Sequence, residues 1–343
     1  MNEYPPPAFA FRKPRSAAFL FLRHSFTLVE MLAAMAIFAI IFLVIAQIVT
    51  TTSASTILSN RNADAAAQAR LAFERIGVDL NALVNRPDAD FLAGTYDTTG
   101  NYNPFLLIFS SVGSSSSGNR AISTVAYAMN TSSDNYNRLC LMRATSTIPW
   151  TTSAFMGYQA NGYPYAITNL APASTAYNIL APGVIGLAIG FQLYPDSQPI
   201  TLMDGSTVAN GSGATPGSGN ALGQIVYSPP LRTGSTYVDT SRIAAIVIGV
   251  VTLDLNDLNQ LSAAQVQTLA QQFSTTDLSA NGSTPPANGK LPANGQLPVQ
   301  VWQPIINSLS TNTSLGIPLP TLKALQAYDR FYPISSYGNS SSN

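Results

Sequence analysis

The 343-residue chain is long enough to bury a hydrophobic core in one large domain or two modest ones. Only 9% of its residues are charged and the formal net charge is zero, which argues against a basic surface for nucleic acid, and we expect no nucleic-acid partner. The single cysteine, Cys140, excludes an intrachain disulfide and every C-x-x-C zinc or redox motif, and we expect it to be buried in a strand.

The first predicted element is an apolar helix over residues 26–49, which contains no Gly or Pro and one ionisable side chain, Glu30. These 24 residues reach about 36 Å as a helix, more than the roughly 30 Å of a hydrocarbon core. Four Lys or Arg residues precede the helix within residues 12–23, and none follows it before Arg61. Because positive residues stay on the cytoplasmic side, this bias predicts a single-pass helix with a cytoplasmic N-terminus.

Glu30 is the unusual residue of this helix. A carboxylate well inside an apolar span costs on the order of 3 kcal/mol on insertion scales, so such a residue indicates a function and a partner of opposite charge. The alternative is that Glu30 lies close enough to the membrane interface to be hydrated.

The sequence around the start of this helix carries a recognisable motif. Ser25 followed by FTLVEMLAAMAI resembles the class III signal of type IV pilins and type II secretion pseudopilins, in which a small residue precedes Phe and Glu occupies the fifth position. The resemblance implies that prepilin peptidase cuts between Ser25 and Phe26 and methylates the Phe26 amine. It also implies that Glu30 pairs with the Phe26 ammonium of a neighbouring subunit, so that a buried charge becomes a paired one.

The chain departs from the family pattern at two positions. Ser25 stands where Gly is usual, and Gln47 lies in the region where many pilins carry a Pro. The leader, residues 1–25, is also long and contains the apolar run AAFLFL.

Residues 50–86 are predicted to continue the helix, which we call the spine helix, as an amphipathic segment. Apolar residues recur at intervals of three and four: Ala65, Ala69, Ala72, Phe73, Ile76, Leu80, Leu83 and Val84. The charged residues occupy the other positions: Arg61, Asp64, Arg70, Glu74 and Asp79. One face is therefore expected to pack in a head domain, with Pro87 ending the helix near Asn85. The stretch RLAFERIGVDLNALV resembles J-type minor pseudopilins, and the chain also resembles pilin-like cassette proteins of Verrucomicrobia.

Residues 87–343 are predicted to form a β-rich head. Five runs have strand character: residues 105–112, 122–129, 138–145, 184–194 and 243–255. The last run is apolar on both faces, which predicts a central strand, and it is too short for a second membrane span. The predicted fold class is α+β, with a long N-terminal helix, transmembrane and then amphipathic, packed on an antiparallel sheet.

The end of the chain gives mixed signals. Ser262 and Gln265 predict a capped short helix over AAQVQTLAQQF. Residues 274–298 contain three Asn-Gly pairs and are predicted to be a low-complexity loop. Residues 320–333 fit either a last helix or a strand that returns to the sheet, and periodicity does not decide between them.

The sequence offers little for catalysis. His24 is the only histidine and lies in the leader, so the mature chain would lack a Ser-His-Asp triad or a histidine metal site, and we predict neither enzyme activity nor a cofactor. Asp254, Asn256 and Asp257 could supply oxygen ligands to Ca2+, although the spacing of a calcium-binding loop is missing. The alternative for these residues is a solvated turn or a helix cap.

The function predicted from the resemblance is a structural subunit, a minor pilin or pseudopilin of a type IV pilus or type II secretion-like filament. Its predicted partners are prepilin peptidase, other pilins or pseudopilins and the inner-membrane assembly platform. The predicted location is the bacterial inner membrane, with the head in the periplasm or in an extracytoplasmic filament. The alternatives are an adhesin or binding module on an uncleaved helix, and an anchored hydrolase, which the lack of histidine disfavours.

Overall fold

The computed structural model describes twelve segments of the chain: residues 27–84, 92–97, 102–111, 121–129, 139–149, 177–194, 200–202, 207–208, 225–227, 240–273, 295–312 and 314–334. The chain separates into two compact units, Met1–Ser55 and Thr56–Asn343. The second unit includes the second half of the first helix, which contributes residues to the core of the head.

Helix α1 runs unbroken from Leu28 to Asn81, so the predicted continuous spine helix is confirmed. It ends at Asn81 and not near Asn85, because the chain that follows pairs with strand β2 (Tyr102–Ser110). Leu83 forms an antiparallel bridge with Ser110, and the Val84 N–H donates to the Phe109 carbonyl at 2.8 Å. Backbone pairing, already complete before residue 87, therefore ends the helix, and Pro87 lies outside the described residues.

The first sheet has five antiparallel strands in the order β1-β2-β3-β4-β5. Besides β2, its strands are β1 (Leu92–Asp97), β3 (Ala121–Met129), β4 (Cys140–Pro149) and β5 (Tyr177–Pro182). Cys140 is buried at the start of β4, as predicted. Each strand therefore pairs with its neighbour in sequence, as in a simple meander.

The second sheet has four strands in the order β11-β10-β6-β9. The strands are β6 (Val184–Leu193), β9 (Ile225–Val226), β10 (Ile243–Thr252) and β11 (Gln326–Pro333). A short β7–β8 hairpin (Ile200–Thr201 and Thr207–Val208) is separate, and the 3-10 turn η2 (Thr240–Arg242) leads into β10. Strand β10 lies between β11 and β6, which confirms that the apolar run from Ile243 is a central strand.

Among the described residues between β10 and β11, the chain forms four short helices. They are α3 (Leu255–Gln260), α4 (Ala263–Gln271), α5 (Pro298–Leu309) and α6 (Leu319–Lys323). The predicted capping box of α4 is confirmed, because Ser262 Oγ accepts from the Gln265 N–H at 3.4 Å and Gln265 Oε1 accepts from the Ser262 N–H at 2.9 Å. Residues 320–333 turn out to contain both a helix, α6, and a strand, β11.

Helix α5 was not predicted from the sequence, and it contains two prolines. Pro298 occupies the first helical position, where no backbone N–H is needed. Pro304 lies inside α5 and has no N–H to donate to the carbonyl of Gln300, four residues earlier. Both residues are exposed, so water can bind that carbonyl instead. The predicted loop 274–298 therefore ends where α5 begins, and residues 274–294 lie outside the described residues.

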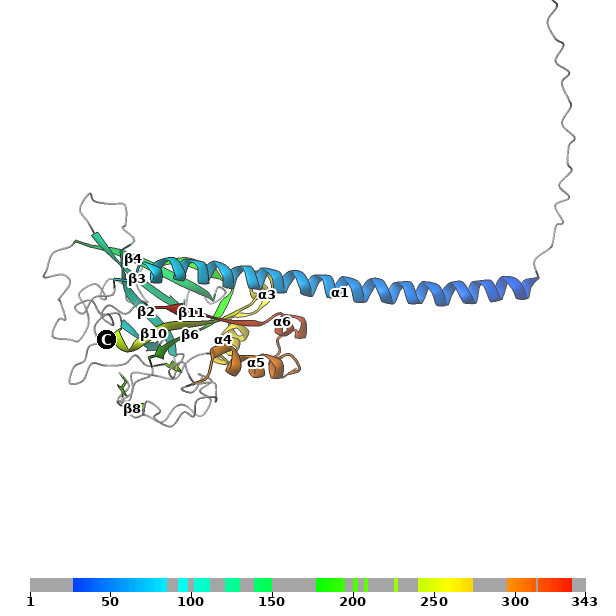
Figure 1. Ribbon diagram of the computed structural model, residues 1–343. Coiled ribbons are helices and arrows are strands. Elements are labelled where there is room, and N and C mark those ends of the chain that lie inside the picture. Colours follow the sequence, from blue (N-terminus) through cyan, green and yellow to red (C-terminus); the bar gives the residue numbers. More distant parts are fainter. Residues whose placement is uncertain are drawn as a thin grey trace, which may run out of the picture. The chain divides into compact units, whose positions relative to one another are not determined.

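The four-stranded sheet is covered on both faces (Figure 1). On one face, Ile246, Ile248 and Val250 share a hydrophobic cluster with the five-stranded sheet and with α1 residues such as Phe73 and Ile76. On the other, Val247 and Val251 pack with residues of helices α3 to α6, including Trp302 of α5. Side chains of a strand alternate between its faces, so burial of both faces requires the continuous apolar run seen in the sequence.

Gly249 sets the distance between β10 and α5. A Cβ at this position would lie 2.3 Å from Pro298 Cβ and 3.1 Å from Trp302 Cζ3. Because protein cores are close-packed, only a residue without a side chain lets the first turn of α5 rest on the strand.

Candidate functional site

The start of α1 is fixed by a reciprocal capping box between Thr27 and Glu30. Thr27 Oγ1 accepts from the Glu30 N–H at 3.3 Å, while Glu30 Oε2 accepts from the Thr27 N–H at 2.9 Å and from Thr27 Oγ1 at 3.1 Å. A carboxylate in the first helical turn also interacts favourably with the helix dipole. Glu30 was predicted to depend on a neighbouring subunit for a partner, and the structure gives it a local one as well.

The predicted processing residues, Ser25 and Phe26, lie outside the described residues, as does the rest of the leader. Thr27 is the first described residue, so Glu30 is the one predicted signal residue whose contacts the structure gives.

The first half of α1 is apolar and exposed along its whole described length. Every residue from Thr27 to Thr56 is exposed, and most of the large exposed aliphatic and aromatic side chains of the described chain lie in this stretch. The Thr50 and Thr51 hydroxyls donate to the Gln47 carbonyl at 2.9 Å each, so they satisfy their hydrogen bonds inside the helix. Among the described helices, α1 is long and apolar enough to cross a membrane.

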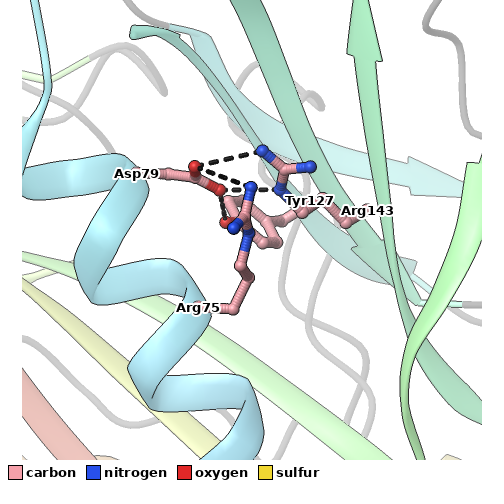
Figure 2. A network of polar contacts seen from close by, with 4 residues as sticks. All are labelled: Arg75, Asp79, Tyr127 and Arg143. Carbon is pink, nitrogen blue, oxygen red and sulfur yellow. Dashed lines mark hydrogen bonds and ion pairs between the residues drawn. The ribbon is translucent and has the colours of Figure 1, made fainter. Parts of the chain in front are cut away.

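The second half of α1 is tied to the five-stranded sheet by a buried charge cluster centred on Asp79 (Figure 2). Arg143 of β4 donates to Asp79 through Nε at 2.7 Å and through Nη2 at 3.0 Å, and Tyr127 of β3 donates its hydroxyl to the same carboxylate. Arg75, one turn earlier on α1, places Nη2 at 3.5 Å from Asp79 Oδ1. Asp79 is fully buried, so these donors compensate a charge that would otherwise be costly.

The electrostatics of the cluster make Tyr127 a hydrogen-bond donor and not an acid. Burial, and then the negative charge of Asp79, raise the pKa of the Tyr127 hydroxyl well above its ordinary range. The phenol therefore stays neutral, and one carboxylate faces two guanidinium groups, which leaves the cluster with a net positive charge.

Two further polar contacts join α1 to other parts of the head. Tyr332 of β11 donates its hydroxyl to the Phe73 carbonyl at 2.6 Å, and Gly77 leaves room for the Tyr332 ring because a Cβ there would lie 3.1 Å from Cε1. Arg61 Nη1 lies 3.2 Å from Asp257 Oδ1 of α3. Together with Asp79, these contacts connect one face of α1 to β3, β4, β11 and α3.

The proposed calcium ligands are not arranged as a solvated loop. Asp254 and Asp257 are 3% and 1% exposed, while Asn256 lies on the exposed side of α3. Asp254 occupies the N-cap position of α3 without a side-chain capping hydrogen bond, and Asp257 is paired with Arg61. Within the described residues, no three His, Cys, Asp or Glu side chains gather as a metal site.

Burial is the main influence on Asp257. It raises the pKa of the carboxyl, which the Arg61 charge opposes and the nearby Asp254 charge reinforces. The ion pair with Arg61 thus offsets only part of the cost of burying Asp257.

Asp79 is buried, although it was predicted to lie with the charged residues outside the apolar row. It lies three residues after Ile76 and seven after Ala72, both in the buried row. This spacing was a usable signal, since i+3 and i+7 positions share one helix face. Arg143 and Tyr127, which complete the cluster, come from strands whose pairing could not be read from the sequence.

The chain combines a long N-terminal helix, apolar in its first half, with antiparallel β-sheets, as its resemblance to type IV pilins predicts. The prokaryotic N-terminal methylation motif matches residues 21–46, which include the predicted cleavage junction and Glu30. Comparison with curated proteins and with solved structures gives no significant match. The motif thus confirms the predicted class III signal, and it indicates processing by a prepilin peptidase, membrane anchoring and assembly with other pilins.

Proposed function

We propose that this chain is a structural filament subunit, a minor pilin or pseudopilin of a type IV pilus or type II secretion-like system. The observation that carries the proposal is the methylation motif at residues 21–46, which overlaps an exposed apolar helix that begins at Leu28. Such a surface is stable in lipid or against other apolar helices, and its length suits a membrane span. The head would lie in the periplasm or in the filament, and the subunit would act without catalysis.

The proposal gives Glu30 two successive partners. In the chain described here Glu30 caps its own helix through Thr27. Cleavage before Phe26 would create an ammonium one residue away from Thr27, and a neighbouring subunit would bring a second ammonium to the same carboxylate. An ion pair in an apolar environment tolerates burial far better than a lone charge, so this pairing would favour assembly.

The first test is the mature N-terminus. Mass spectrometry of the protein from its native membrane should find a chain that begins with N-methylated Phe26. A bulky residue at Ser25 should block cleavage without preventing membrane insertion, whereas Ser25→Gly should be cleaved at least as fast. An intact N-terminus at Met1 would support the uncleaved anchor of an adhesin instead.

The second test separates capping from charge pairing. Glu30→Gln keeps the hydrogen-bond acceptor that a capping box needs but removes the charge, whereas Thr27→Ala removes the cap and keeps the charge. Charge pairing predicts that Glu30→Gln and Glu30→Ala insert normally but fail to co-purify with other pilins. Thr27→Ala should assemble, with at most a modest loss. Normal assembly of Glu30→Gln would refute the pairing mechanism.

A further inference from the structure

Strand β11 is an open edge of the four-stranded sheet. It pairs with β10 over eight residues without a register shift, and no described residue pairs with its other side. The other edge strands of the two sheets are shorter: β9 has two residues, β1 and β5 have six each, and β5 pairs across a register shift. β11 is therefore the longest regular edge in the described part of the chain. A long, regular edge is a template on which a further strand can form.

The pairing register shows which backbone groups of β11 point away from β10. The Ile334 N–H donates to the Ala244 carbonyl at 2.9 Å, in the same register that β10 and β11 keep along their length. In an antiparallel ladder, such hydrogen-bonded pairs alternate with pairs whose N–H and C=O groups point outward. The outward groups of β11 are therefore those of Ala327, Asp329 and Phe331. Among the described residues, no backbone carbonyl accepts from these three N–H groups.

Two exposed side chains flank the free edge, one on each face of the sheet. Phe331 lies opposite Val247, on the face that α5 covers, and it is 41% exposed. Arg330 lies opposite Ile248, on the face that α1 covers. Arg330 is exposed and makes no ion pair with a described residue, and its guanidinium group lies 5.5 Å from the centre of the Tyr332 ring.

The other charged residue of β11, Asp329, is occupied within the head. Its carboxylate accepts a hydrogen bond from the Val299 N–H in the first turn of α5, and the residue is half-buried. Carboxylates at this end of a helix interact favourably with the helix dipole. Arg330 is therefore the charge that β11 offers to a partner.

A second copy of β11 is a poor partner for this edge. Two antiparallel copies related by a two-fold axis keep paired side chains on the same face, so their contact centres on one residue. Pairing over most of the strand would centre on Asp329 or on Arg330, and it would oppose two carboxylates or two guanidinium groups. Like charges directly opposite each other destabilise a pair of strands.

We propose that β11 binds an extended segment of another protein, which adds to the four-stranded sheet as a fifth strand antiparallel to β11. The segment carries an apolar residue opposite Phe331, followed by an acidic residue opposite Arg330. Pairs of an aromatic with an apolar side chain, and of opposite charges, stabilise neighbouring strands. Backbone hydrogen bonds supply the affinity, and these two side chains select the segment. The contact involves neither the leader nor α1, so it goes beyond the proposed function.

A synthetic octapeptide, TTVETTVT, with both ends blocked, is the probe. In antiparallel pairing its first Val lies opposite Phe331 and its Glu opposite Arg330, while Thr and Val at the other positions favour an extended backbone. Fluorescence polarisation of the labelled peptide measures its affinity for the full-length chain in detergent micelles. We expect saturable binding, and no binding up to about 1 mM would overturn the proposal.

N-methylation of the peptide tests the backbone hydrogen bonds. Methyl groups on its third, fifth and seventh residues remove the N–H groups that face β11, whereas methyl groups on the fourth, sixth and eighth residues replace N–H groups that face away. The first set should lower the affinity at least about tenfold, because the hydrogen bonds to β11 are lost, and the second set should leave it nearly unchanged. Equal losses from both sets would overturn strand addition.

Variants of the chain, each verified as folded by circular dichroism, test the side chains and the edge. Arg330→Gln should lower the affinity about two- to fivefold, the range of an exposed ion pair, and should bind the probe no better than a peptide with Gln in place of Glu. Lys323→Gln, at an exposed charge on α6, is the matched control and should change nothing. Ala327→Pro removes one outward N–H and should weaken binding, whereas Ala327→Thr should not. A preference for the Glu peptide that survives Arg330→Gln would refute the selection by charge.

Two further measurements would identify a different occupant of the edge. A peptide with the sequence of β11, QAYDRFYP, that binds as tightly as the probe would assign the edge to a second copy of the chain. Binding of the probe that appears only after deletion of residues 335–343 would assign the edge to the chain's own C-terminus. Either result would overturn the proposal, and neither bears on cleavage at Phe26, so the proposed function is tested separately.

Discussion

Both halves of α1 are helical, but their polar side chains find hydrogen-bond partners in different places. In the first half, polar side chains bond within the helix itself, as Thr27 does with Glu30 and Thr51 with Gln47. In the second half, Asp79 is reached by an arginine 64 residues away in sequence. The difference indicates that the first half suits contact with lipid or with other subunits, whereas the second half packs against the rest of its own chain.

The largest expected effect comes from removing the second half of α1 from the head. A fragment beginning at Thr56 should be soluble and fold cooperatively, whereas one beginning at residue 87 should not. Phe73, Ile76 and Leu80 are buried in the shared core, and each contributes about 1.5–3 kcal/mol. Their combined loss approaches the whole stability of an ordinary domain, about 5–15 kcal/mol. Chemical denaturation followed by circular dichroism measures both fragments, and a folded fragment from residue 87 would contradict this division.

The next effect concerns Asp79. Asp79→Ala should lower the free energy of unfolding of the Thr56 fragment by about 3–5 kcal/mol, because Arg143 would remain partly buried without its carboxylate. Asp64→Ala, on the exposed face of the same helix, is the matched control and should change stability by less than about 0.5 kcal/mol. Equal effects of the two substitutions would mean that the cluster does not stabilise the head.

Gly249 offers a smaller effect away from α1. Gly249→Ala should destabilise the head by about 1–3 kcal/mol, since the new methyl group overlaps Pro298 and forces α5 off the sheet. Gly190→Ala is the comparison, because its Cβ would come no closer than 3.1 Å to the side chains of Ile225 and Tyr227. The midpoint temperature of thermal unfolding should be lower for Gly249→Ala than for Gly190→Ala. The reverse order would show that α5 adapts easily to the added methyl group.

The smallest expected effect is a pH dependence at Asp257. Its pKa in the folded state is raised above the ordinary value of 3.8, so the folded state binds this proton more readily than the unfolded chain. The charged carboxylate therefore costs stability at neutral pH, and that cost disappears as the pH falls through the raised pKa towards 3.8. Unfolding measured across this window should show the parent gaining stability relative to Asp257→Asn on acidification. A constant difference between the two proteins would contradict the raised pKa.

Sequence patterns predicted those parts of the molecule that depend on local chemistry. The signal at Phe26 to Glu30, the central strand at Ile243 and the cap at Ser262 are each encoded within a few consecutive residues. The division of the head into two sheets is not, because it depends on which strands pair. Neither is the charge cluster, since Tyr127 and Arg143 become neighbours of Asp79 only after the five-stranded sheet has formed.

The contact between Tyr332 and Phe73 has a consequence for the order of events during biogenesis. These residues are 259 positions apart, and Tyr332 belongs to the last strand of the sheet that covers α1. Folds dominated by such distant contacts form slowly, because the chain must close a long loop before any gain follows. The head therefore cannot close while its C-terminal strand is still being synthesised. Until then the apolar row of α1 that this core covers stays exposed.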